Sequence, residues 1–144
     1  MAPNTISLRV WTIKEDNAPL EASKDITPGM LIEFSGGDVQ PNSNASAIPA
    51  PVLIAVEAPQ RSGAGIDTAY DVDAEEVNFH YAHSGEQFYM WLAAGQEVDN
   101  LTDRLGSDAA GALQIATTYA FCRPLELVDN SAGYVSARIR VEVL

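Results

Sequence analysis

The segment from Val77 to Asp108 constrains the fold more than any other feature of the chain, because apolar and polar residues alternate along it. From Phe88 to Leu92 every second residue is a large apolar side chain, a period of two that is typical of a β-strand with one buried face. Residues 77–83 alternate in the same way. Ser84–Gly85 separates the two arms, and because glycine readily adopts a positive φ, the segment predicts a β-hairpin.

The other face of the second arm carries Tyr89 and Trp91, which are large side chains for a surface open to water. We expect this face to be covered, for example by another subunit, because exposed aromatic residues concentrate at interfaces. Trp11 is a second interface candidate on the same grounds. Packing of both tryptophans into the protein's own core is the alternative.

Residues 134–143 alternate most regularly of all. Ile139 and Val141 fall on one face of this expected strand, and Arg138 and Arg140 fall on the other. Further strands are expected at residues 5–13, 30–34, 51–57, 112–119 and 121–128.

Polar stretches with glycine or proline separate these strands. Residues 14–19 and 36–50 predict loops, the second of them long and mobile at its tip. Helical turns are expected only within residues 58–76 or around 98–105.

Short strands with irregular turns and no internal repeat predict an all-β fold, either a small β-barrel or a sandwich. A chain of 144 residues fits one domain that folds without disulfides or metal. We expect an extended N-terminal arm or strand over residues 1–13 and a single β-rich domain with long loops over residues 14–144.

The formal net charge of −12 argues against nucleic acid as a partner, because only eight Lys and Arg side chains exist to contact phosphates. Cys122, the single cysteine, has no intrachain partner, and its apolar neighbours predict a buried, inert thiol. The N-terminal residues lack the pattern of a secretory signal, and no stretch approaches 18 uninterrupted apolar residues. We therefore expect no membrane association and a reducing, soluble compartment.

Two groups of candidate metal ligands do not form a convincing site. Residues 71–75 carry acidic side chains at the first three ligand positions of a calcium-binding loop, but Glu76 replaces the required glycine and Ala82 replaces the final bidentate acid. His80 and His83 are three residues apart, which in a strand places their rings on opposite faces.

Signatures of catalysis are also missing from the sequence. Glu86 and Glu97 are a conceivable acid and base pair, yet nothing in the sequence brings them to one cleft. Nucleophile and phosphate-binding motifs are absent, and Gly63-Ala64-Gly65 lacks the third glycine of a dinucleotide site. We predict that the chain is not an enzyme and binds no cofactor.

Several segments resemble head decoration proteins of tailed bacteriophages. The resemblance rests on FYMWLAAG at 88–95, the following residues 96–105, the turn at 106–111 and the closing PLELVDNSAGYVSARIRVEVL at 124–144. The segments GMLIEFSGGDVQP and APVLIAVEAPQRSGAGIDTAY fit the same family, so that the likeness extends over most of the chain.

This resemblance implies a capsid cement protein with a β-tulip domain, similar to the lambda-type decoration proteins. Such a protein is made in the host cytoplasm and sits as a homotrimer on the outer surface of the expanded capsid, at three-fold and quasi-three-fold positions. Its partner is the major capsid protein. By binding the expanded shell alone, it would stabilise that state by mass action against the pressure of the packaged genome.

On this basis we assign residues to two contact surfaces as hypotheses. The arm from Asn4 to Trp11 would add to a strand of the capsid or of a neighbouring subunit, with backbone hydrogen bonds giving affinity. Its contact side chains are Ile6, Leu8, Val10 and Trp11. The trimer contact would use Tyr89, Trp91, Arg138 and Arg140.

Two other classes of function remain open. A carbohydrate- or receptor-binding β-module on a virion surface would use the exposed aromatic side chains as stacking platforms and the Asp-rich loop as a polar rim. A trimeric β-barrel enzyme of nucleotide metabolism would need an Asp and a Tyr that converge at subunit boundaries.

Overall fold

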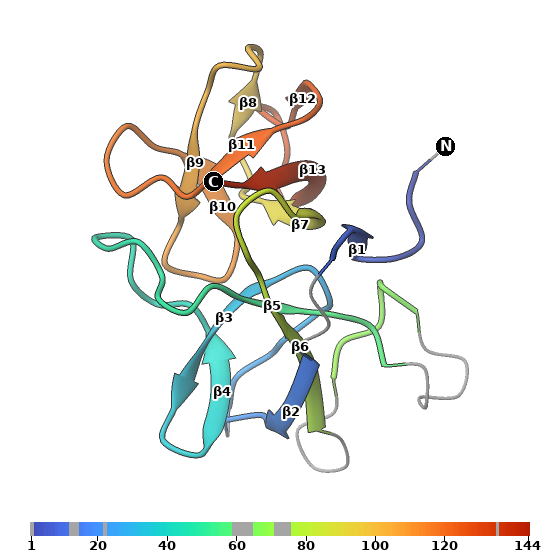
Figure 1. Cartoon of the computed structure of the whole chain (residues 1–144). Coiled ribbons are helices and arrows are strands. Elements are labelled where there is room, and N and C mark those ends of the chain that lie inside the picture. The colour runs from blue at the N-terminus through green and yellow to red at the C-terminus, as the bar shows by residue number, and fades with distance from the viewer. Residues whose placement is uncertain (1, 12–14, 22, 59–64, 71–75, 135) are drawn as a thin grey trace.

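The computed structural model describes residues 2–11, 15–21, 23–58, 65–70, 76–134 and 136–144. Within these ranges the fold contains strands and turns but no helix, which confirms the all-β prediction (Figure 1). The strands form a closed barrel with one extra strand at its side, a second sheet of five strands and a two-stranded ribbon.

The closed barrel consists of five strands from the C-terminal half of the chain. They follow one another around the wall in the order β7, β10, β9, β11 and β13, and β13 pairs with β7 to complete the ring. Only the β7 and β10 pair is parallel. The bounds are β7 Gln87–Leu92, β9 Leu105–Ser107, β10 Leu113–Ile115, β11 Cys122–Pro124 and β13 Ala137–Val143.

The barrel interior is filled by the apolar face that the sequence predicted. Phe88, Met90 and Leu92 of β7 point inward together with Ile139 and Val141 of β13, and all of them are fully buried. Side chains of this size each stabilise the fold by roughly 1.5–3 kcal/mol when removed from water. The alternation in these two strands therefore places Tyr89, Trp91, Arg138 and Arg140 on the outside of the barrel.

A second sheet forms the other layer of the molecule, below the barrel in Figure 1. Its strand order is β2, β6, β5, β3 and β4, and a parallel bridge from Leu20 to Val39 ties the end of β2 to β4. Phe79, Leu53 and Ile32 lie in its own apolar core. The bounds are β2 Glu15–Pro19, β3 Leu31–Ser35, β4 Asp38–Pro41, β5 Leu53–Ala55 and β6 Glu76–Tyr81. The ribbon pairs β8 (Glu97–Val98) with β12 (Val128–Asp129).

The hairpin prediction for residues 77–92 is wrong. Gly85 does turn the chain with a φ of +87°, but β6 and β7 do not pair with each other. β6 pairs with β2 and β5, whereas β7 pairs with β1, β10 and β13. Each arm buries its apolar face in a different core, and residues 82–86 carry the chain from one sheet to the other.

Two loop predictions are also wrong. Both segments predicted as loops contain a strand: β2 lies within 14–19 and β4 within 36–50, and β4 pairs with β3 along its length. No helix forms between residues 98 and 105. The described parts of 58–76 contain none either, and the calcium-like motif at 71–75 lies outside the described residues.

Candidate functional site

The N-terminal arm forms a short strand, β1 (Ser7–Arg9), on the outside of the barrel. It pairs with the start of β7 through Ser7–Phe88 and Arg9–Gln87. Because β13 runs along the opposite edge of β7, β1 and β10 share one edge of that strand. The prediction that the arm forms an extended strand is therefore confirmed for residues 7–9, and its strand partner is the chain itself.

Ile6 anchors the arm to the barrel. Its side chain is fully buried in the barrel core, its N–H donates to Glu57 Oε2 at 3.1 Å, and its carbonyl accepts a hydrogen bond from Tyr89 N at 2.8 Å. The assignment of Ile6 to a capsid contact is thus wrong for this conformation, because a side chain within the core is not accessible to a partner.

Trp11 closes the arm over the turn between the two sheets. Its backbone N–H donates to Glu86 Oε2 at 3.0 Å, and its indole ring lies on the backbone of Gly85. A Cβ added to Gly85 would lie only 2.7 Å from the ring. Even so, 59% of Trp11 remains exposed, Val10 beside it is exposed as well, and Leu8 is half-buried.

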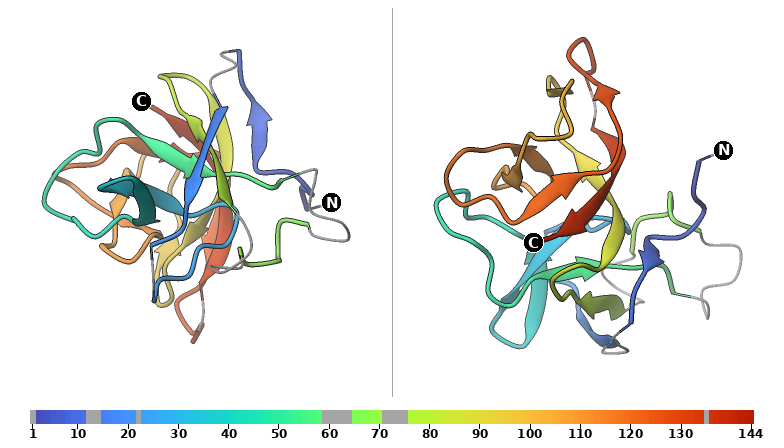
Figure 2. Two further views of the ribbon diagram at one scale, coloured as in Figure 1. Left: turned by 90° about the horizontal axis from the view of Figure 1, so that it is seen from below. Right: turned by 45° about the horizontal axis from the view of Figure 1, so that its top comes forward.

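The outer edge of β1 offers backbone groups to a partner. β1 is the last strand of its sheet, and within the described residues no strand pairs with its second edge. Figure 2 shows the N-terminal end of the chain, before Ile6, leading away from both sheets. An edge of this kind is a template for an added strand.

The four residues assigned to the trimer contact lie together on the β7–β13 ladder. Trp91 pairs with Arg138 and Tyr89 pairs with Arg140 in the β7–β13 ladder. The Arg138 guanidinium carbon lies 4.0 Å from the centre of the Trp91 ring and 5.7 Å from that of Tyr89. At these distances the cation is attracted by the faces of both rings.

Arg138 is committed to contacts within the chain. Only 6% of its side chain is exposed, and it donates to the carbonyl oxygens of Pro28 and Ile66 and to Asp67 Oδ1. Trp91 Nε1 also donates to the Pro28 carbonyl, at 3.0 Å. The chain's own turn at Pro28 therefore partly covers the face that the sequence predicted to be covered, and the salt bridge of Arg138 is made to Asp67 of the same chain. Arg140 pairs with Glu126 at 4.0 Å.

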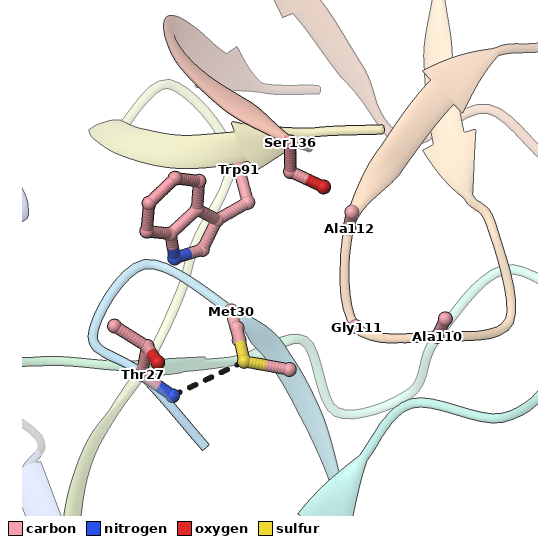
Figure 3. Close-up of a pocket in the computed structure, with 7 residues that line it drawn as sticks. All are labelled: Thr27, Met30, Trp91, Ala110, Gly111, Ala112 and Ser136. Carbon is pink, nitrogen blue, oxygen red and sulfur yellow. Dashed lines mark hydrogen bonds between the residues drawn. The ribbon is translucent and has the colours of Figure 1, made fainter. Parts of the chain in front are cut away.

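A shallow cavity of about 350 Å³ adjoins Trp91 (Figure 3). Met30 and Thr27 form one side, and the turn from Ala110 to Ala112 forms the other, with Ser136 above it. Most of the lining is apolar. The cavity therefore continues the outer surface of the barrel beside Trp91 as a mostly apolar hollow.

Glu86, which the sequence indicated only as a conceivable acid or base, is a buried carboxylate that organises the turn beneath Trp11. Glu86 is fully buried and accepts hydrogen bonds from the backbone N–H groups of Trp11 and His83. His80 Nε2 and His83 Nδ1 lie 3.4 and 3.7 Å from Glu86 Oε1. The two rings approach one oxygen because β6 ends at Tyr81 and the chain then turns back.

Glu86, His80 and His83 do not form a metal site, and Cys122 is not placed as a reactive thiol. Among the described residues, no group of three or more His, Cys, Asp or Glu side chains is placed to hold a metal ion. Glu97 lies on β8 in the two-stranded ribbon, apart in the topology from the turn that holds Glu86. Cys122 is fully buried in the barrel core, and burial raises the pKa of its thiol, which confirms the prediction of a buried cysteine.

No helix in the described part of the chain is long and apolar enough to span a bilayer. No protein-family model matches the chain, and a search of curated proteins finds no match either.

Proposed function

We propose that the chain is a decoration protein of a tailed-phage head, which binds as a homotrimer to the outer surface of the expanded capsid at three-fold and quasi-three-fold positions. The observation that carries this proposal is the arm. A strand whose outer edge pairs with no other described strand lies beside exposed Val10 and Trp11, on the closed barrel. This arrangement suits strand addition to a partner.

The capsid contact uses the free edge of β1 and the side chains beyond it. Backbone groups of Ser7–Arg9 supply hydrogen bonds to a strand of the major capsid protein, and Leu8, Val10 and Trp11 supply apolar contact. Ile6 has a different role from the one first assigned, because it fixes the arm to the barrel. An arm that is already held in place loses less conformational entropy on binding than a disordered tail.

The trimer contact uses the apolar area around Trp91. Arg138 stacks on the Trp91 ring and Pro28 accepts its Nε1 hydrogen bond, so that the indole is held in one orientation before a neighbour arrives. Met30 and the adjoining cavity add apolar area that a second subunit covers.

The work of such a protein is mechanical. Each trimer adds contacts that exist only in the expanded lattice, and binding one state alone stabilises that state. Many weak interfaces repeated over the shell then act together. The strong negative charge of the chain disfavours adhesion to nucleic acid released nearby.

Cosedimentation with expanded capsids of the cognate major capsid protein tests this proposal. The Trp11→Ala variant should lose most of its binding, because truncation of a central aromatic contact residue typically weakens an interface by about 2 kcal/mol or more. Tyr134→Ala is the matched control, since Tyr134 is 99% exposed and lies outside both proposed surfaces.

The control variant should bind as the unchanged protein does. Full binding by Trp11→Ala would contradict the role of the arm in the capsid contact. Failure of the unchanged protein to sediment with capsids would contradict the proposed function itself.

A further inference from the structure

Four polar side chains form a row across four neighbouring strands. They are Arg9 of β1, Gln87 of β7, Glu142 of β13 and Arg123 of β11, and each is the register partner of the next. Paired residues point to the same side of a sheet, and Gln87 points outward because Phe88 beside it points into the barrel. The row therefore lies on the outer face of the barrel, and it ends at β1, the strand to which a partner would add.

The register of the arm places Arg9, and not Leu8, at the end of this row. Ser7 is opposite Phe88 and Arg9 is opposite Gln87, so that the arm advances by two residues while β7 advances by one. Leu8 is thus an extra residue, as in a β-bulge, and bulges often re-aim a side chain. A regular antiparallel register would set the apolar Leu8 opposite Gln87. The irregularity therefore brings a cation to this position.

The inner part of the row is already joined by hydrogen bonds. Glu142 Oε1 accepts from Arg123 Nε at 3.0 Å, and Glu142 Oε2 accepts from Gln87 Nε2 at 3.4 Å. Arg9 is two strands away from Glu142, about 9–10 Å between the backbones. Accordingly, the hydrogen bond from Arg123 has the largest lowering effect on the pKa of Glu142, and the charge of Arg9 has the smallest.

Arg9 is exposed and has no carboxylate within ion-pair distance among the described residues, although the chain carries a net charge of −12. A strand added to the outer edge of β1 would place one residue directly opposite Arg9 and on the same face, with Cβ atoms about 4.5–5.5 Å apart. This is about half the spacing between Arg9 and Glu142. A carboxylate at that position would continue the row with alternating charge.

We propose that Arg9 selects a partner strand that carries an aspartate or glutamate opposite it. The inference rests on the strand addition proposed above and adds the chemistry of the partner, a strand of the major capsid protein. β1 of a second copy offers only Ser7, Leu8 and Arg9, so that it has no carboxylate to supply and brings a like charge instead. A charge at the rim of an interface acts in this way on association rate and specificity.

The test is cosedimentation of the full chain with expanded capsids of the cognate major capsid protein. At low salt Arg9→Gln should bind about fivefold more weakly, as expected for the loss of one exposed ion pair. Arg9→Lys keeps the charge and should lose less. At about 1 M salt, where the Debye length is about 3 Å, the difference between Arg9→Gln and the unchanged protein should largely disappear.

Arg104→Gln is the matched control, because it makes the same change in net charge at another exposed arginine. Arg104 donates to the carbonyl oxygens of Thr102 and Asp103 in its own loop, away from β1. The control should bind as the unchanged protein does. Thermal unfolding checks that each variant is folded.

Charge reversal identifies the partner residue. Arg9→Glu should bind at least tenfold more weakly, and lysine in place of one acidic residue of the capsid protein should restore its binding. Failure of every such substitution would overturn the inference. Equal binding by Arg9→Gln and Arg104→Gln, or a difference that salt does not reduce, would also overturn it and leave the proposed function standing. If the unchanged protein does not sediment with capsids, the proposed function fails and this inference fails with it.

Discussion

At the scale of single residues, Gly85 decides whether the arm can close on the barrel. Its φ of +87° and the contact with the Trp11 ring both require that it has no side chain. Gly95 has nearly the same φ, +83°, but nothing lies within 4 Å of the Cβ that it lacks. A comparison of substitutions at the two positions therefore separates the cost of backbone strain from the cost of displacing the Trp11 indole.

We expect Gly85→Ala to lower the free energy of unfolding more than Gly95→Ala does. Both substitutions carry the strain of a positive φ, about 1 kcal/mol or more. Only Gly85→Ala also displaces the Trp11 ring. The tryptophan emission of this variant should therefore shift toward that of a solvated indole. Urea unfolding and emission spectra measure both effects, and identical behaviour of the two variants would contradict the observed Trp11 contact.

Arg138 is a second residue whose chemistry is specific. Its planar guanidinium stacks on Trp91 and reaches the Pro28 and Ile66 carbonyls at once, which a lysine ammonium cannot do. Arg138→Lys should therefore destabilise the fold by about 2 kcal/mol. Arg123→Lys is the control, because Arg123 and Glu142 form a more exposed pair, which is worth less than about 1 kcal/mol. Equal losses in urea unfolding would show that the stacking adds nothing.

At the scale of elements, sequence periodicity indicated which faces are buried but not which strands pair. The alternation from Gln87 to Leu92 and along β13 was read correctly because a single buried face leaves a period of two. The turn at Gly85 led to the wrong hairpin prediction, because the sequence of a turn is the same whether the flanking strands pair with each other or enter different sheets. The strand Glu15–Pro19 was missed because its residues are polar and include a proline.

The buried polar groups were least predictable. Glu86, Asn42 and Arg138 belong to residue types that usually stay at the surface, and the side chain of each is buried among partners distant in sequence. Periodicity did place Tyr89 and Trp91 on one face of their strand and Arg138 on the polar face of another. It could not show that the turn at Pro28 would occupy part of that face.

At the scale of the whole molecule, acid should weaken the barrel through its last strand. The hydrogen bond from Arg123 lowers the pKa of Glu142 below 4.5, against a smaller opposing effect of burial. Because the folded pKa is the lower one, this contribution is complete above pH 4.5 and is lost as the pH falls through the folded pKa.

Glu142→Gln should consequently show a smaller fall in melting temperature between pH 6 and pH 3 than the unchanged protein. Glu97→Gln removes the same charge from an exposed site and is the matched control. Thermal unfolding followed by circular dichroism at both pH values makes the comparison. An equal fall in melting temperature for Glu142→Gln and Glu97→Gln would show that the acid sensitivity comes from net charge alone.

The pairing of β1 with β7 also fixes an order of events at the ribosome. Ser7–Arg9 is made early, but the strand on which it docks, Gln87–Leu92, emerges on the order of ten seconds later at ordinary translation speeds. The turn that holds Trp11 is completed later still, because Gly85 N and Glu86 O bond to Val143 near the C-terminus. A nascent chain therefore keeps the edge of Ser7–Arg9 that will face β7 unpaired until Gln87–Leu92 has been made, and the arm gains its last contacts only when translation has almost finished.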